Sequence, residues 1–362
     1  MNLLNTELCE ILGIQHPIIQ GGMGPYRTES LAIAVSRAGA LGVISSIGMA
    51  ASLLPEAAPI DPIRLFGEDA PTELLRKSIE RVTRSLQSTD RVFGVNVPVA
   101  SEFLPASEMF IRQVVESRGN DSNVERRLRV LITSAGNPKP WSVVKKHGLI
   151  WIHVVPSVYH ARKAEQSGVD IIVASGHEGG AHVSWEPVHS IVLVPAVVRA
   201  VRCPVVAAGG FCDGVSLAAA LCLGAVGVQM GTRFIATQES DFEDVWKSAI
   251  IEREERQTLT GRGIFGPMRS LRNRRAEMIV EQTLDDIPEF YLGRPVPSNE
   301  RILSLEREGF DCLLDGDSDN ALMFGGECVG RIGDLPTVKE LIDRMVEEAH
   351  QVLRRAYESY CT

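Results

Sequence analysis

The chain has 362 residues, of which 44% are hydrophobic and 23% are charged, and its formal net charge is −9. This composition is typical of a folded globular protein and excludes a disordered or fibrous chain. No cluster of Lys and Arg indicates a nucleic-acid or membrane surface, and no apolar run reaches the roughly 18 residues of a membrane span. We therefore expect neither nucleic acid nor membrane as a partner.

The cysteines and the start of the chain bear on where the protein works. The seven cysteines are scattered, and none belongs to a CxxC pair. They are therefore expected to be reduced thiols without a zinc site. The first residues lack the basic block and the following apolar block of a signal peptide. Together these features predict a cytoplasmic protein.

Short apolar or β-branched segments alternate with segments of helical character from about residue 16 onward. Strands are predicted at 16–20, 41–46, 92–97, 129–134, 149–154, 170–175, 203–208 and 226–231. Their nearly continuous apolar character is typical of strands that are covered on both faces. Regular alternation of strands and helices predicts parallel β/α units, and eight such units predict an α/β fold of the (β/α)8 TIM-barrel class. A doubly wound open sheet is the alternative, because one misassigned strand would change the count.

We expect two parts in the chain. The barrel is predicted over residues 1–240, with an insertion at 49–91 after the second strand that combines a Pro-rich stretch and a charged helix. Residues 241–362 continue well past the eighth strand and are predicted to form a C-terminal helical extension packed on the barrel.

Glycines and polar residues collect where the predicted strands end, which is the edge at which TIM-barrel enzymes place their active sites. The stretches "VVAAGGF" and "VQMGTRF" end the seventh and eighth strands, and loops at these positions commonly bind phosphate. Glycine lets the backbone approach an anion closely, and backbone amides point at it. Gly209, Gly210 and Gly231 therefore predict a phosphate site, to which Thr232 would add its hydroxyl. Tight turns without a ligand are the alternative.

Several of these stretches resemble one known family. The stretches "PIIQGGMG", "FGVNVP", "ASGHEGGAH", "PVVAAGGFCDG" and "GAVGVQMGTRF", followed by the weaker "LTGRGIFGPMRSLRN", occur in order between about residues 11 and 275. They resemble the nitronate monooxygenase (2-nitropropane dioxygenase) family, FMN-dependent TIM barrels related to the FMN-containing enoyl-ACP reductases. The resemblance implies FMN as the cofactor. It implies as cofactor-binding residues Gly22, Met23, Asn96, Ser175, Gly180, Gly209, Gly210, Gln229, Met230, Gly231 and Thr232.

The resemblance also assigns a role to the loop "SGHEGGAH" at 175–182. The last His of the family pattern faces the flavin and transfers a proton, which implies that His182 is the catalytic residue. An imidazole suits this role because it titrates near neutrality. His177 and Glu178 are candidates for orienting the substrate. A structural hydrogen bond is the alternative for His177, and Glu178 is expected to be an orienting hydrogen-bond partner and not the base. Ser175 stands where the family has Gln, and His177 is additional, so the substrate is left open.

A metal site in this loop is not expected. His177 and His182 are five residues apart, which would place them about 140° apart around a helix, and the double glycine disfavours a helix.

These observations predict an FMN-dependent oxidoreductase. The first choice of activity is that of a nitronate monooxygenase, which oxidises alkyl nitronates or nitroalkanes with O₂ to a carbonyl compound and nitrite. An NAD(P)H-dependent enoyl-thioester reductase is the alternative, and a non-catalytic barrel that binds a phosphorylated ligand is the third hypothesis. The expected partners are a small-molecule substrate and either O₂ or NAD(P)H, and a homodimer is left open.

Overall fold

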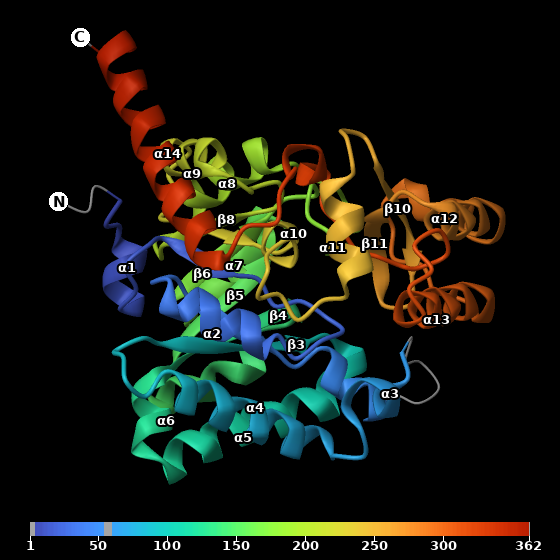
Figure 1. Cartoon of the computed structure of the whole chain (residues 1–362), viewed down its shortest axis with the longest axis horizontal. Coiled ribbons are helices and arrows are strands. Elements are labelled where there is room, and N and C mark those ends of the chain that lie inside the picture. The colour runs from blue at the N-terminus through green and yellow to red at the C-terminus, as the bar shows by residue number, and fades with distance from the viewer. Residues whose placement is uncertain (1–3, 54–59, 362) are drawn as a thin grey trace.

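The computed structural model of the chain describes residues 4–53 and 60–361. Its centre is a parallel sheet with helices around it (Figure 1). The sheet has eight strands in the order β1-β9-β8-β6-β5-β4-β3-β2, and a bridge between Ile19 and Leu41 joins the first strand to the last. The strands close into a TIM barrel, which confirms the predicted fold against the open sheet. Their bounds are β1 (Ile18–Gln20), β2 (Gly42–Ser45), β3 (Phe93–Val99), β4 (Leu128–Gly136), β5 (Ile150–Val155), β6 (Ile171–Ser175), β8 (Val205–Ala208) and β9 (Val228–Met230).

The inside of the barrel is an apolar core that is closed at one end. Inward-facing side chains such as Ile132, Ile152 and Val173 pack together, and Leu8 and Leu12 of helix α1 (Glu7–Leu12) belong to the same cluster. The Thr6 hydroxyl donates to the backbone oxygen of Val226, just before β9 begins. Helix α1 therefore covers the end where the strands start, and the opposite end, where they finish, is the place for a site.

An outer layer of helices connects successive strands. It comprises α2 (Glu29–Arg37), α4 (Pro71–Ser85), α5 (Leu104–Asn120), α6 (Ser122–Arg127), the 3-10 helix η3 (Lys139–His147), α7 (Val158–Gln166), α8 (Ser190–Ala200) and α9 (Gly214–Cys222). Part of the predicted insertion at 49–91 is therefore the ordinary crossover helix α4 between β2 and β3. Before α4 come the 3-10 helix η1 (Gly48–Leu53) and α3 (Pro62–Phe66), while residues 54–59 lie outside the described residues.

The last helix of the chain completes this outer layer. Helix α14 (Val338–Tyr360) packs against α9 and α2, as Figure 1 shows. Its buried side chains Val338, Leu341 and Met345 belong to the core cluster that the barrel strands form with the other helices. Helix α14 thus fills the place between α9 and α2 that an eighth barrel helix would take.

The segment between β9 and α14 lies beside the barrel (Figure 1). It holds α10 (Thr232–Ile235), α11 (Asp244–Ile251), α12 (Arg274–Asp286), α13 (Glu300–Leu314) and the 3-10 helices η4 (Pro288–Leu292) and η5 (Glu327–Arg331). It also contains a hairpin of β10 (Thr258–Gly263) and β11 (Gly266–Leu271), which the sequence analysis did not predict. Trp246, Phe310 and Met323 centre a second apolar core. Among residues 4–53 and 60–361, no helix has both the length and the apolar character to cross a membrane.

Candidate active site

The ends of β1, β3 and β9 meet at the open end of the barrel. Gly22, which follows β1, lies directly against the side chain of Asn96 on β3, and a Cβ at Gly22 would overlap the Asn96 amide. A Cβ at Gly231, which follows β9, would lie 3.3 Å from the sulfur of Met23. The structure thus brings together predicted residues from three distant parts of the chain.

Two amide side chains at this end of the barrel have a buried oxygen atom without a partner among the described residues. Asn96 is 2% exposed, and its Nδ2 donates to the Ile132 backbone oxygen at 3.3 Å and to Ser134 Oγ at 3.2 Å. Its Oδ1, and likewise Oε1 of Gln229, is buried without a hydrogen-bond partner in the described part of the chain. An unpaired buried acceptor costs about 1–3 kcal/mol. These two oxygens therefore suit a ligand that presents N–H donors, as the edge of a flavin ring does.

The loops after β6 and β8 touch backbone to backbone. Gly209 and Gly210 have φ values of 88° and 86°, in the left-handed region that favours glycine. A Cβ at Gly209 would lie 2.5 Å from the backbone oxygen of Gly176, and one at Gly210 would lie 3.3 Å from Cβ of Glu178. Nearby, Thr232 Oγ1 accepts a hydrogen bond from the Gly326 amide at 3.0 Å, so its own hydroxyl proton stays free to be donated.

The remaining residues that the resemblance implied occupy different surroundings. Ser175 ends β6, and Met230 ends β9 and is buried. Gly180 packs against the segment Gly325–Gly326, because a Cβ there would lie 2.7 Å from backbone atoms of both glycines. Close packing on this segment is thus an evident reason for glycine at position 180.

His182 lies on a short strand, β7 (Ala181–His182), that pairs with β11 of the hairpin. Its ring centroid is 6.0 Å from that of Phe265 and 6.1 Å from that of Phe324. The side chain is exposed, yet the protein enclosing its other sides desolvates the ring. This desolvation, together with the positive charge of Arg262, lowers the pKa of His182 to about 4. The imidazole is therefore neutral at pH 7 and able to accept a proton.

His177 is half-buried earlier in the same loop. Its ring centroid is 5.8 Å from that of His189. Desolvation, and after it the charges of Arg269 and His189, lower the pKa of His177 to about 4. Its Nδ1 is buried without a hydrogen-bond partner among the described residues. This free nitrogen is compatible with contact to a ligand, and substrate orientation stays a prediction for His177.

The carboxylate of Glu178 serves the first turn of helix α8. It accepts hydrogen bonds from the Ser190 amide at 2.9 and 3.0 Å and from the Ser190 hydroxyl at 3.1 Å. A carboxylate at a helix N-terminus satisfies free amides and favours the helix dipole. These contacts give the Glu178 carboxylate a structural role at the start of α8, and substrate orientation by this residue stays a prediction.

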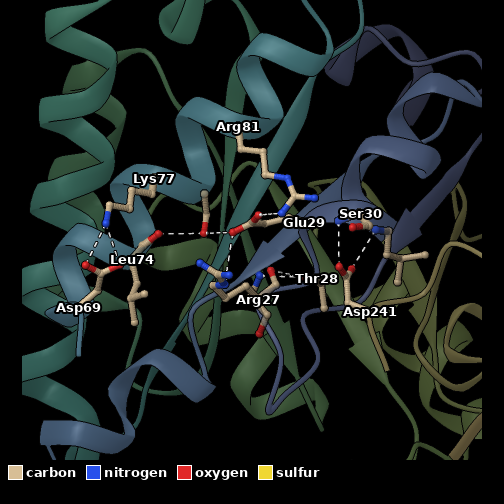
Figure 2. A network of polar contacts seen from close by, with 12 residues as sticks. Arg27, Thr28, Glu29, Ser30, Asp69, Leu74, Lys77, Arg81 and Asp241 are labelled. Atoms are coloured by element: carbon tan, nitrogen blue, oxygen red, sulfur yellow. Dashed lines mark hydrogen bonds and ion pairs between the residues drawn. The ribbon is translucent and has the colours of Figure 1, made fainter. Parts of the chain in front are cut away.

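A polar network surrounds residues 27–30, where the loop that carries Gly22 and Met23 meets α2, and Figure 2 shows this network. The loop ends at Thr28, whose hydroxyl donates to the backbone oxygen of Val43 at 2.9 Å. The buried carboxylate of Glu29 pairs with Arg81 at 2.9 Å and with Arg27 at 3.4 Å. Asp241, from the segment after β9, accepts hydrogen bonds from the Ser30 and Leu31 amides at the start of α2 (Figure 2). The loop is thus tied both to α4 and to the segment after β9.

Comparison with known proteins identifies the family. The model of a family described as nitronate monooxygenase matches residues 5–348. The chain belongs to the nitronate monooxygenase family. This confirms the resemblance drawn from the sequence, and the chain is accordingly an oxidoreductase.

Three relatives illustrate the range of this similarity. A "(3aS,4S,5R,7aS)-5-hydroxy-7a-methyl-1-oxo-octahydro-1H-indene-4-carboxyl-CoA dehydrogenase" from Rhodococcus jostii is 28% identical, over 96% of this chain and 97% of the relative. A probable nitronate monooxygenase of Staphylococcus aureus is also 28% identical, over 96% and 98%. The structure of FabK from Thermotoga maritima is 31% identical with a TM-score of 0.78, covering 98% of this chain and 99% of FabK. These relatives are named for different reactions, so the similarity alone does not identify the substrate of this chain.

The residues that the segment after β9 places around His182 were not predicted from the sequence. Phe265 lies in the turn between β10 and β11 and also contacts Phe103, with ring centroids 4.7 Å apart. Arg262 on β10 is buried, stacks on Trp185 at 4.9 Å and faces His182 as a nearby charge. The stretch "LTGRGIFGPMRSLRN", which covers both Arg262 and Phe265, was the available signal, because it belongs to the weaker part of the family resemblance.

Proposed function

We propose that this protein is an FMN-dependent nitronate monooxygenase, which oxidises alkyl nitronates or nitroalkanes with O₂ to a carbonyl compound and nitrite. Membership of the family supports the reaction class. The observation that carries the choice of substrate is the place of His182, an exposed imidazole that follows β6 and lies beside the rings of Phe265 and Phe324.

The residues at the strand ends fit FMN. The unpaired oxygens of Asn96 and Gln229 would accept hydrogen bonds from the ring system. The ring would lie against Gly22 and Met23, where a Cβ at Gly22 would leave no room for Asn96. When bound, FMN would supply the redox chemistry by accepting electrons from the substrate and passing them to O₂.

The phosphate of FMN would lie at the two glycine loops. The left-handed turn at Gly209 and Gly210 and the adjacent strand end at Gly231 expose backbone rather than side chain. The Thr232 hydroxyl, whose oxygen accepts from the Gly326 amide, would donate its own proton to the phosphate. Backbone amides and a hydroxyl donor are the groups that bind a phosphate monoester.

His182 would act as a base. With its pKa lowered to about 4, the ring is neutral at physiological pH and would take a proton from the carbon next to a nitro group.

A thioester substrate is the second candidate, and one observation favours it. The Rhodococcus relative is named for a carboxyl-CoA substrate, at the same sequence identity as the probable nitronate monooxygenase. The enoyl-thioester reductase predicted as the alternative would use NAD(P)H as its reductant and would share the FMN site.

An anaerobic bleaching experiment separates these functions. The purified protein is loaded with FMN and mixed separately with a propyl nitronate, NADH and NADPH, while the flavin absorbance is followed. Bleaching by the nitronate alone supports the proposal, and bleaching by NADH or NADPH alone supports the thioester reductase. A protein that takes up no FMN, or that binds FMN and is bleached by none of the three, would contradict both candidates.

A further inference from the structure

Arg269 on strand β11 holds the loop that carries His182. Its Nε and Nη2 donate to the backbone oxygen of His177 at 3.3 and 3.2 Å. Its Nη1 donates to Thr258 Oγ1 at 3.1 Å, and its Nη2 lies 2.9 Å from a carboxylate oxygen of Glu327. We propose that Arg269 is a positioning residue for His182, an inference that rests on the proposed function of His182 as a base.

The loop needs such support because its own sequence does not fix its shape. Glycine stands at 176, 179 and 180, and each glycine leaves the backbone free to move. Ala181, directly before His182, has a φ of 60°. A residue with a side chain costs about 1–3 kcal/mol in this region and keeps it only where its surroundings impose it. The orientation of His182 therefore depends on contacts from outside the loop.

Those contacts come from Arg269 and its ion-pair partner. In the β7–β11 ladder Arg269 lies opposite Ala181, the strained residue. While the Arg269 side chain binds the His177 carbonyl, the Glu327 amide donates to the Glu178 carbonyl at 2.9 Å. Two successive carbonyls of the loop are thus held by one ion pair of the segment after β9.

The burial of Arg269 agrees with a positioning role. The residue is 6% exposed, and burial is the main cause that lowers its pKa from the ordinary value. A buried guanidinium costs free energy unless its donors are satisfied. Here the guanidinium donors bind a carbonyl of the loop, a hydroxyl and a carboxylate. The planar guanidinium of arginine fits these three partners better than the single ammonium of lysine would.

Arg275 provides a matched control in the same segment. It is 5% exposed and binds Glu308 at 2.9 Å and the Asn320 backbone oxygen at 3.1 Å. It contacts α13 and the following loop instead of the loop with His182. A lysine at either position removes the same fork, so a general loosening of the segment would affect the two variants alike.

The first measurement needs no activity. Hydrogen–deuterium exchange is followed in peptides that cover residues 176–184 of the full-length protein. Arg269→Lys should speed exchange there about tenfold, since it removes hydrogen bonds of a charged donor, and Arg275→Lys should leave it as in the parent. Unchanged exchange in Arg269→Lys, or equal changes in both variants, would overturn the proposal.

The second measurement tests whether Arg269 acts through His182. Arg269→Lys should lower kcat for a neutral nitroalkane about tenfold while the Kd for FMN stays unchanged. In a His182→Asn background the same substitution should have no further effect, because the group it positions is gone. An additive effect in the double variant would overturn the proposal. If the parent protein oxidises no nitro compound, the proposed function is wrong, and the exchange measurement alone decides whether Arg269 holds the loop.

Discussion

Gly209→Ala probes the contact between the loops after β6 and β8. Two costs follow from the structure. An alanine would have to keep a φ of 88°, which costs about 1–3 kcal/mol. Its Cβ would also lie 2.5 Å from the oxygen and 2.9 Å from the nitrogen of Gly176. Both neighbours are backbone atoms that cannot rotate away, so overpacking adds about 1–3 kcal/mol. The total is roughly 2–6 kcal/mol, a large share of the stability of an ordinary protein.

Gly231→Ala is the matched control at the other glycine loop. Gly231 has a φ of −110°, which any residue adopts, and its Cβ would meet only the flexible side chain of Met23 at 3.3 Å. We expect the free energy of unfolding of this variant to stay within about 1 kcal/mol of that of the parent.

Urea denaturation of the FMN-free variants and quenching of FMN fluorescence measure the two consequences. If the loop of Gly209→Ala keeps its place, the strain appears as lost stability. If the loop shifts instead, the donors to the phosphate move, and the Kd for FMN should rise about tenfold or more. A Gly209→Ala variant with the stability and the FMN affinity of the parent would show that the two loops do not meet as described.

Three further predictions test other parts of the molecule. His182→Asn should keep FMN bound and slow turnover of a neutral nitroalkane about 100-fold or more. His177→Asn should slow it less. If steady-state rates show the larger loss for His177→Asn, His177 and not His182 is the base. Asp241→Ala should cost about 1 kcal/mol in urea denaturation, because it removes the acceptor for the first amides of α2. Asp69→Ala loses only an exposed ion pair and should change stability by less than about 1 kcal/mol, so equal losses would contradict this account. Burial, followed by the charge of His160, lowers the pKa of His153 from 6.5 to about 4, so its contribution to stability is full above pH 6.5 and is lost as the pH falls towards 4. His153→Gln should flatten the loss of stability between these pH values in urea titrations, and an unchanged slope would assign the loss to other groups.

The barrel could be predicted because buried parallel strands have a local signature. Segments such as 92–97 and 203–208 are apolar almost throughout, since both faces of each strand are covered, and the structure has strands at Phe93–Val99 and Val205–Ala208. The turns at the strand ends could also be predicted from their glycines, because the left-handed backbone at Gly209–Gly210 allows few other residues.

The hairpin and the place of α14 leave no comparable signature. The hairpin strands contain Gly261, Gly263 and Gly266 and show no alternation of polar and apolar residues, so their pairing depends on contacts that form only in the folded protein. The amphipathic pattern of α14 predicts a helix with one buried face. It cannot tell that this face packs on α9 and α2, more than 100 residues earlier in the chain.

The same limit explains why the surroundings of His182 were missed, and it indicates how the site is divided. The residues proposed to hold FMN lie on barrel strands or in the loops that follow them, whereas Phe265, Phe324 and Arg269 belong to the segment between β9 and α14. That segment is joined to the barrel at both ends, by β9 before it and by α14 after it, and its strand β11 pairs with β7, which carries His182. Changes in it would alter the space beside His182 while the strand ends that fit FMN stay the same. We therefore expect substrate choice to be determined mainly by this segment, which agrees with the different names of relatives that match almost the whole chain.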